Sequence, residues 1–174
     1  GIAAAICLVE QGHSVTIFER GSRLGGTPDA IIPASRYGNA LNEVEAILDP
    51  AVKAGRATVK TGQELGRNVD LAGIRPAFDA VLLSFGLSGS TSLGKAEGVV
   101  DALAFLRDVK AGTFRSAPDR VAVLGGGNTA MDAALVARQL GARDVYLVYR
   151  RSFAEMPAWP AERERFMASG GHCL

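Results

Sequence analysis

The sequence predicts an α/β protein in which helices flank parallel β-sheets. Short apolar runs rich in β-branched residues alternate along the chain with longer helical segments. The 21 glycines among 174 residues fall in short loops between these segments rather than in a low-complexity tract. Strands that alternate with helices are typical of parallel sheets, because each parallel pair needs a crossover connection between its two strands.

The composition fits a globular protein and excludes several partners. The 19 Lys and Arg residues nearly balance 18 Asp and Glu, so the formal charge is +1 and offers no basic excess for nucleic acid or an acidic membrane. The stretch without charged residues at 80–94 is shorter than the roughly 20 residues that span a bilayer. Cys7 and Cys173 form no Cys-x-x-Cys pair, so no metal or iron–sulfur centre is expected in this chain.

The first half of the chain predicts two helices and three strands. The helices are expected at 1–11, which Gly12 suits as a C-cap, and at about 39–54, where Pro50 is expected to bend the helix. Residues 21–33 predict a loop, because glycines and prolines interrupt them. The strands are expected at 14–19, 57–61 and 79–84, and the last is a continuous apolar run, as in parallel strands covered on both faces.

The second half contains a complete β-α-β pattern. A helix at 99–110 and a polar linker at 112–119 precede it. The pattern itself comprises a strand at 121–124, a glycine loop, a helix at 128–140 capped by Gly141, and a strand at 145–149. We therefore predict two lobes, one at 1–113 and the other at 114–174.

The glycine loop of the second lobe has the spacing of a dinucleotide-binding fingerprint. Its G-x-G-x-x-A form is carried by Gly125, Gly126, Gly127, Asn128, Thr129 and Ala130. In this pattern the first glycine permits the turn, the second lets the backbone approach a pyrophosphate, and the small third residue lets helix and strand pack closely. The phosphate then lies at the positive end of the helix dipole. The alternative is an ordinary glycine-rich αβ turn.

The residues after the second strand indicate which dinucleotide is bound. A carboxylate there would bind a ribose 2′-hydroxyl, whereas arginine accommodates a 2′-phosphate. This strand ends in Tyr149-Arg150-Arg151, which favours NADP(H) over NAD(H) by charge and by bidentate geometry. The alternative is that Arg150 and Arg151 are simply solvated surface residues.

The start of the chain resembles the same unit without its first strand. The step from Gly1 to Gly12 is 11 residues, as is the step from Ala130 to Gly141, so Gly1 is interpreted as the last glycine of a fingerprint. Glu19 then ends the following strand, where it would bind a ribose without a 2′-phosphate, as in FAD or NAD. Because no basic leader precedes the helix, we expect a truncated cytoplasmic protein. The alternative is an ordinary amphipathic helix and strand.

These motifs, in this order, resemble the NADPH-dependent glutamate synthase small (beta) subunit and related flavoproteins with two dinucleotide-binding domains. The resemblance covers essentially the whole chain and is carried by Glu19, Gly25-Gly26, Ile32-Pro33, 79–83, 121–132, Tyr149-Arg150-Arg151 and Glu155-Met156-Pro157-Ala158. It implies Rossmann-like lobes, FAD on the first and NADPH on the second, with the second inserted in the first. The flavin-binding residues it implies are Gly1, Glu19, Arg20, Gly25, Gly26, Thr27, Arg36 and, more loosely, Leu65.

The chemistry that the resemblance implies is hydride transfer from NADPH to FAD, followed by electron transfer to iron–sulfur clusters held by a missing N-terminal segment or by a partner. A larger synthase subunit or an iron–sulfur protein would be that partner. The cofactors carry this chemistry, so we assign no catalytic residue, and a disulfide reductase is excluded because the chain lacks a reactive cysteine pair. We expect the 174-residue chain alone to be inactive, to bind NADPH weakly and to bind FAD poorly or not at all. The alternative is a non-catalytic fragment that binds a nucleotide or a partner without turnover.

Overall fold

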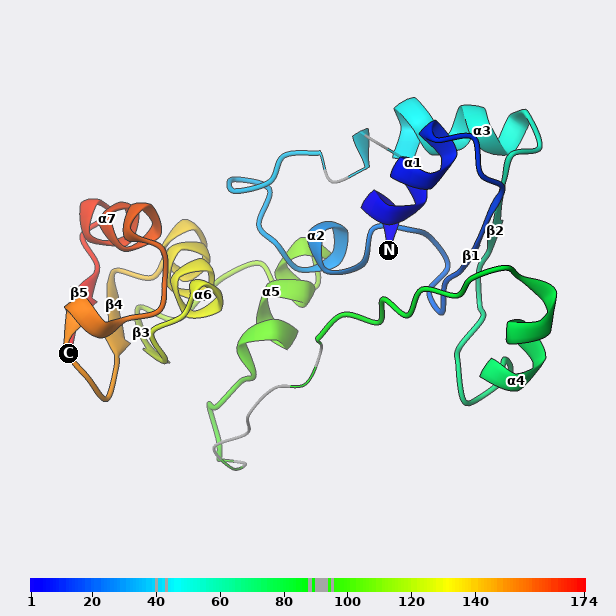
Figure 1. Ribbon diagram of the computed structural model, residues 1–174. Helices are drawn as coiled ribbons and strands as arrows, with labels where there is room; N and C mark the ends of the chain where they lie inside the picture. The colour runs from blue at the N-terminus through cyan, green and yellow to red at the C-terminus, as the bar shows by residue number, and fades with distance from the viewer. Residues whose placement is uncertain (40, 43, 88, 90–93, 95) are drawn as a thin grey trace. The chain divides into compact units, whose positions relative to one another are not determined.

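The computed structural model describes residues 1–39, 41–42, 44–87, 89, 94 and 96–174 (Figure 1). Positions 40 and 43 of the predicted helix at 39–54, and most of 88–95, lie outside the described residues. The chain divides into two compact units. Unit 1 comprises Gly1–Asp29 and Asn39–Ser88, and unit 2 comprises Ala30–Gly38 and Gly89–Leu174. The assignment of 1–113 to FAD and 114–174 to NADPH concerns ligands and stays a prediction.

Unit 1 is built around a pair of parallel strands, β1 (Val15–Phe18) and β2 (Ala57–Lys60), with Val15 opposite Ala57. Helix α1 (Ile2–Glu10) precedes β1, and the short α2 (Gly26–Ala30) lies in the predicted loop. A π-helical segment, η1 (Val44–Leu48), runs directly into α3 (Asp49–Lys53). The core of the unit comprises Ala5, Ile6, Val9, Leu24, Val44, Leu48, Ala51 and Ala57.

Pro50 explains why this helix changes type rather than continuing regularly. Proline lacks a backbone N–H and is tolerated in the first turn of an α-helix but not in its interior. In the structure Pro50 stands in the first turn of α3, immediately after the π-helical segment. The predicted bend therefore takes the form of a junction between two helix types.

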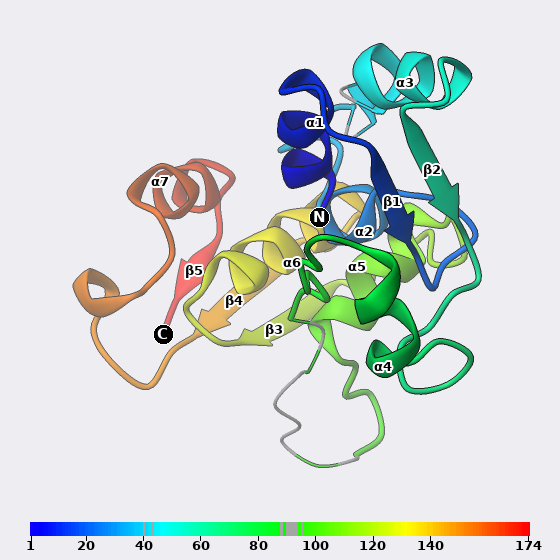
Figure 2. The same cartoon turned by 45° about the vertical axis from the view of Figure 1, so that its right-hand side comes forward.

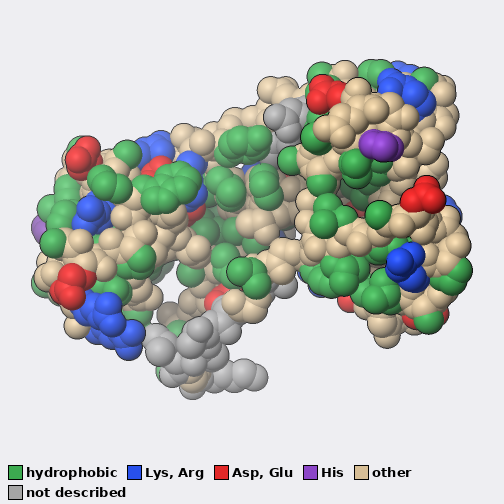
Figure 3. All heavy atoms as spheres, in the orientation of Figure 1, with side chains coloured by type: hydrophobic (Ala, Val, Ile, Leu, Met, Phe, Trp, Pro, Cys, Tyr) green, Lys and Arg blue, Asp and Glu red, His purple; other side chains and the backbone are tan. Residues whose placement is uncertain are grey.

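The predicted strand at 79–84 is wrong. After α4 (Leu71–Ile74) and the 3-10 turn η2 (Arg75–Ala77), the described residues of this run are irregular. Leu82 and Leu83 are 66% and 50% exposed, so the run lacks the cover on both faces that a buried parallel strand requires. Figure 3 shows such apolar side chains mixed with charged ones on the visible face of each unit.

Unit 2 confirms the predicted β-α-β pattern and adds a strand. Strand β3 (Arg120–Leu124), helix α6 (Asn128–Gln139) and strand β4 (Asp144–Val148) follow in order, and the strands are parallel. A 3-10 turn, η3 (Phe153–Glu155), and helix α7 (Pro160–Ala168) lead to β5 (His172–Cys173), which pairs with β4. The sheet order is thus β3-β4-β5, and Figure 2 shows α6 alongside β3 and β4.

One face of this sheet forms the core of unit 2. Val145 and Leu147 of β4 are fully buried, and alternate residues of β3 turn to the same side. They pack against the small-residue face of α6 and against Phe166 of α7. Helix α5 (Ala102–Lys110) lies against α6 and, through Leu106, joins Val136 and Ile31 in a second cluster. The segment Ala30–Gly38 therefore belongs to the packing of unit 2.

The described part of the chain contains no helix long and apolar enough to cross a membrane.

Candidate functional site

The loop between β3 and α6 has the backbone geometry that its glycines predict. Gly125 donates its N–H to the carbonyl of Val148 at 2.9 Å and has φ +145°, a conformation that favours glycine. A Cβ added to Gly125 would lie 3.4 Å from the Cβ of Ala130, which is itself buried. Glycine at the first position and alanine at the last therefore allow α6 to start close against the sheet.

Gly126 must be glycine for a different reason, because the ring of Tyr149 occupies the space that a side chain would need. A Cβ added to Gly126 would lie 2.7 Å from Cδ2 of Tyr149 and 2.9 Å from its Cγ. The carbonyl of Gly126 accepts a hydrogen bond of 3.0 Å from the N–H of Ala158. The loop is thus packed between the end of β4 and the segment that precedes α7.

Gly127 leaves the loop open toward solvent at the start of α6. It caps the helix with extended backbone, and a Cβ added to it would meet no atom within 4 Å. Asn128 turns its side chain to the neighbouring segment, where Oδ1 accepts the N–H of Trp159 at 2.9 Å. The open space at Gly127, the positive end of the α6 dipole and its first backbone N–H groups suit a pyrophosphate. The residues present therefore fit a dinucleotide.

Arg150 and Arg151 follow β4 on the same side of unit 2 as this loop, since Tyr149 contacts Gly126. Both arginines are exposed, and neither forms an ion pair with another described residue. Thr129, in the first turn of α6, is also exposed. The cationic groups at the end of β4 are therefore accessible to an anionic ligand.

A buried charge cluster lies one turn along α6 from Asn128. Asp132 is 6% exposed and forms an ion pair with Arg36, whose Nε also lies 3.8 Å from Oε1 of Glu162. The guanidinium of Arg36 lies over the indole of Trp159, 5.5 Å from its centroid. Burial raises the pKa of Asp132, while the hydrogen bond and charge of Arg36 oppose this rise.

The predicted flavin residues other than Arg36 lie in unit 1. Glu19 follows β1 and its Oε1 accepts the N–H of Gly21 at 2.7 Å. Gly25 has φ +126°, and a Cβ there would lie 2.3 Å from Cβ of Asp29, so only glycine fits. Gly1 caps α1, and a Cβ there would make ordinary 3.7 Å contacts with Ser84, so packing does not demand glycine. Arg20, Gly26, Thr27 and Leu65 are exposed.

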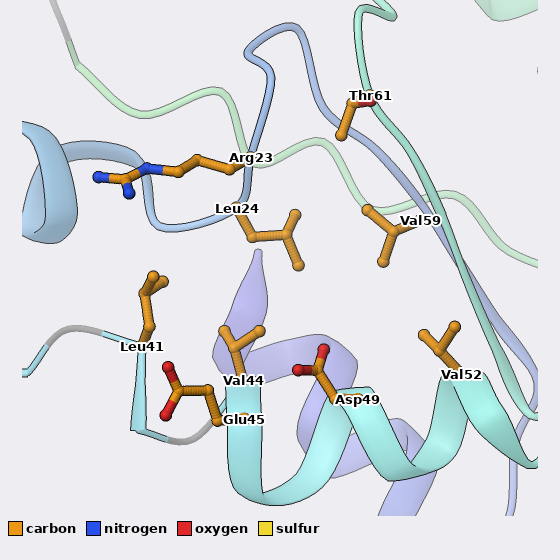
Figure 4. A pocket seen from close by; sticks show the side chains of 9 residues that line it. All are labelled: Arg23, Leu24, Leu41, Val44, Glu45, Asp49, Val52, Val59 and Thr61. Atoms are coloured by element: carbon orange, nitrogen blue, oxygen red, sulfur yellow. The ribbon is translucent and has the colours of Figure 1, made fainter.

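A cavity of about 340 Å³ in unit 1 lies apart from these predicted residues. Figure 4 shows Leu24, Val44, Val52 and Val59 around its space, with the carboxylates of Glu45 and Asp49 at the helix side. Glu19, Gly25, Gly26 and Leu65 do not line it. The cavity is mainly apolar, and no predicted cofactor contact depends on it.

Sequence reasoning missed three residues of the unit 2 site, namely Asp132, Trp159 and Glu162. Asp132 carried a local signal, because it is the only charged residue in the apolar stretch Ala130–Ala134 of the predicted helix. Trp159 and Glu162 follow the motif Glu155-Met156-Pro157-Ala158, and no local pattern showed that they contact α6 or Arg36. Among the described residues, no group of three His, Cys, Asp or Glu could hold a metal ion.

In unit 2 a glycine loop joins a parallel strand to a helix, and the end of the next strand packs against this loop. This arrangement defines a Rossmann-like α/β protein, as predicted. The family model of the pyridine nucleotide-disulphide oxidoreductases matches residues 1–169, and the chain belongs to this family. The chain is 37% identical over 179 residues to the NADP(+)-dependent formate dehydrogenase subunit beta of Moorella thermoacetica, covering 98% of this chain and 25% of that subunit.

The predicted kinship with glutamate synthase small subunits is also confirmed. A putative glutamate synthase [NADPH] small chain of Cereibacter sphaeroides is 32% identical, over 90% of this chain and 40% of that protein. The structure of Mycobacterium tuberculosis FprA in complex with NADPH superposes with a TM-score of 0.71 at 18% identity, over 96% of this chain and 44% of FprA. The chain therefore spans less than half the length of each of these proteins.

Proposed function

We propose that this chain is part of an NADPH-dependent flavoprotein oxidoreductase that passes hydride from NADPH to FAD and electrons on to iron–sulfur clusters. The observation that carries the proposal is the open glycine loop at Gly127 beside two unpaired arginines at the end of β4. The loop offers backbone N–H groups to a pyrophosphate, and the arginines offer guanidinium groups to a 2′-phosphate.

Each group has a defined part in binding. Gly125 and Ala130 hold the start of α6 against the sheet, so that the first N–H groups of the helix point to one place. Gly126 admits the Tyr149 ring, which fixes the end of β4 and therefore the origin of Arg150 and Arg151. Arg150 and Arg151 then favour NADPH over NADH, because a guanidinium binds a phosphate dianion more strongly than a neutral ribose hydroxyl.

The flavin part of the proposal rests on unit 1. Glu19 stands at the end of β1, where a carboxylate binds an adenosine ribose, and the turn at Gly25 and Gly26 follows it. When bound, the nicotinamide and the flavin supply the hydride chemistry themselves. The chain itself contributes binding and orientation.

The relatives support an electron-transfer subunit rather than a self-contained enzyme. One is named a beta subunit of an NADP(+)-dependent formate dehydrogenase and another an NADPH glutamate synthase small chain. We infer that the full protein works with a larger synthase subunit or an iron–sulfur protein. Which substrate is finally reduced or oxidised depends on that partner.

Calorimetric titration of the chain with NADPH and with NADH tests the nucleotide assignment. We expect NADPH to bind at least about tenfold more tightly than NADH. Arg150→Ala should lower the NADPH affinity by at least about tenfold and leave the NADH affinity unchanged, since a charged hydrogen bond contributes about 1.5–3 kcal/mol. Arg120→Ala is the matched control, because Arg120 is exposed at the opposite end of the sheet. Equal affinity for both nucleotides, or an equal loss for both on Arg150→Ala, would remove the 2′-phosphate argument.

A further inference from the structure

Trp159 combines exposure with a fixed backbone position beside the glycine loop. It is the only tryptophan in the chain, and its side chain is 60% exposed. Its N–H is bound by Asn128, and the N–H of Ala158 is bound by the carbonyl of Gly126. Two consecutive residues are therefore attached by their backbone to the loop and to the first residue of α6.

The indole is also supported from one side. Arg36 lies over the ring at 5.5 Å, and the carboxylates of Asp132 and Glu162 hold its guanidinium. A guanidinium over an aromatic face is an attractive arrangement, and here the cation is anchored to both α6 and α7. Arg36 thus supports the indole from one side, while more than half of the Trp159 surface is exposed to water.

We propose that Trp159 is a ring-stacking residue of the nucleotide site, with its free surface taking a flat heteroaromatic ring of the bound dinucleotide. The proposal rests on the proposed function. Aromatic side chains stack on nucleobases, whose π-faces they match. Because the backbone of Trp159 is attached where the pyrophosphate is expected, both the adenine and the nicotinamide are candidates for that ring, and the experiment distinguishes them.

The test is calorimetric binding of NADPH and of adenosine 2′,5′-bisphosphate, which lacks the nicotinamide, to wild type and variants. We expect Trp159→Ala to weaken NADPH binding about tenfold, in line with stacking losses on alanine substitution, and Trp159→Phe to retain most of the affinity. Phe153→Ala is the matched control, because Phe153 is also an exposed aromatic under a guanidinium, that of Arg163 at 5.2 Å. We expect no effect of Phe153→Ala on affinity.

The second nucleotide identifies the ring. A loss for NADPH alone assigns the nicotinamide to Trp159, and an equal loss for both ligands assigns the adenine. Since Trp159 is the only tryptophan, its emission gives a second readout with NADP(+) and with adenosine 2′,5′-bisphosphate, which do not absorb tryptophan emission as NADPH does, and we expect quenching by the ligand that stacks. Circular dichroism checks that the variants remain folded.

The outcomes separate this proposal from the proposed function. Absence of NADPH binding to the wild-type chain overturns the proposed function and the stacking role together. The stacking role alone is overturned if NADPH binding depends on Arg150 but is unchanged in Trp159→Ala, and if NADP(+) leaves the tryptophan emission of the wild-type chain unchanged.

Discussion

The substitution Gly126→Ala tests whether the Tyr149 ring really sets the shape of the glycine loop. Gly126 is not among the glycines with positive φ, so alanine suffers no backbone penalty there. The new Cβ would instead lie 2.7 Å from Cδ2 and 2.9 Å from Cγ of Tyr149. These atoms are at the root of the ring, and the N–H of Tyr149 is bound to the carbonyl of Leu174 at 3.0 Å, which fixes the backbone from which the ring extends.

The expected loss of stability in Gly126→Ala follows from overpacking. Forcing a methyl group into a filled site costs about 1–3 kcal/mol. For a chain of this size each kcal/mol lowers the melting temperature by about 2–4 °C, so we expect a decrease of about 2–12 °C. Gly127→Ala is the control, because φ is −92° and a Cβ there meets no atom within 4 Å. Its stability should be unchanged or slightly higher.

Thermal unfolding followed by circular dichroism measures the effect, in the wild-type background and in Tyr149→Ala. Removing the ring should abolish most of the loss caused by Gly126→Ala, because the colliding atoms are gone. An undiminished loss in the Tyr149→Ala background, or equal losses for Gly126→Ala and Gly127→Ala, would refute the reasoning.

Two further substitutions address the charge cluster and unit 1. Burial raises the pKa of Asp132, so the folded chain binds a proton there more readily than the unfolded chain. The melting temperature should therefore fall as the pH rises from the ordinary aspartate range through the raised pKa. Asp132→Asn should lack this slope, because the amide does not titrate; identical slopes in a pH series would contradict this. Gly25 has φ +126°, and a Cβ there would lie 2.3 Å from that of Asp29. Gly25→Ala should therefore lower the free energy of unfolding, measured in urea, by at least about 2 kcal/mol. This loss should exceed that of Gly26→Ala, whose Cβ would meet nothing within 4 Å. Equal losses would show that the contact with Asp29 is not decisive.

The β-α-β pattern of unit 2 could be predicted because its signals are local and agree with one another. A β-branched run, a glycine loop, an alanine-rich helix and a second β-branched run follow without interruption, and β3, α6 and β4 begin and end within a residue of the expected bounds. Strand β5 was missed because it has two residues, His172 and Cys173, too few to show a period. Residues 79–84 have the composition of a strand, but pairing partners and cover are not encoded locally.

The candidate site likewise contains residues whose contacts are set by the local sequence and residues whose partners lie far away in the chain. The close packing of Gly125 against Ala130 follows from their spacing, since both belong to the same turn, whereas the contact of Gly126 with Tyr149 of the next strand does not. Arg36 was predicted to contact flavin by resemblance, and in the structure it pairs with Asp132, 96 residues further along the chain. No periodicity could reveal that pair, because it depends on how Ala30–Gly38 packs in unit 2. The flavin contact of Arg36 stays a prediction.

The sequence separation of the Arg36–Asp132 pair also bears on the order of folding. The β3–α6–β4 unit closes through contacts between near neighbours in the chain, whereas this pair closes a loop of 96 residues and so comes late. We therefore expect the segment Ala30–Gly38 to dock on a unit that is already formed, and to detach without unfolding the β3–α6–β4 unit. In hydrogen-exchange terms, α6 should belong to a slow, cooperative unit and 30–38 to a faster one. Detachment of that segment would bring Asp132 into water while the glycine loop keeps its shape.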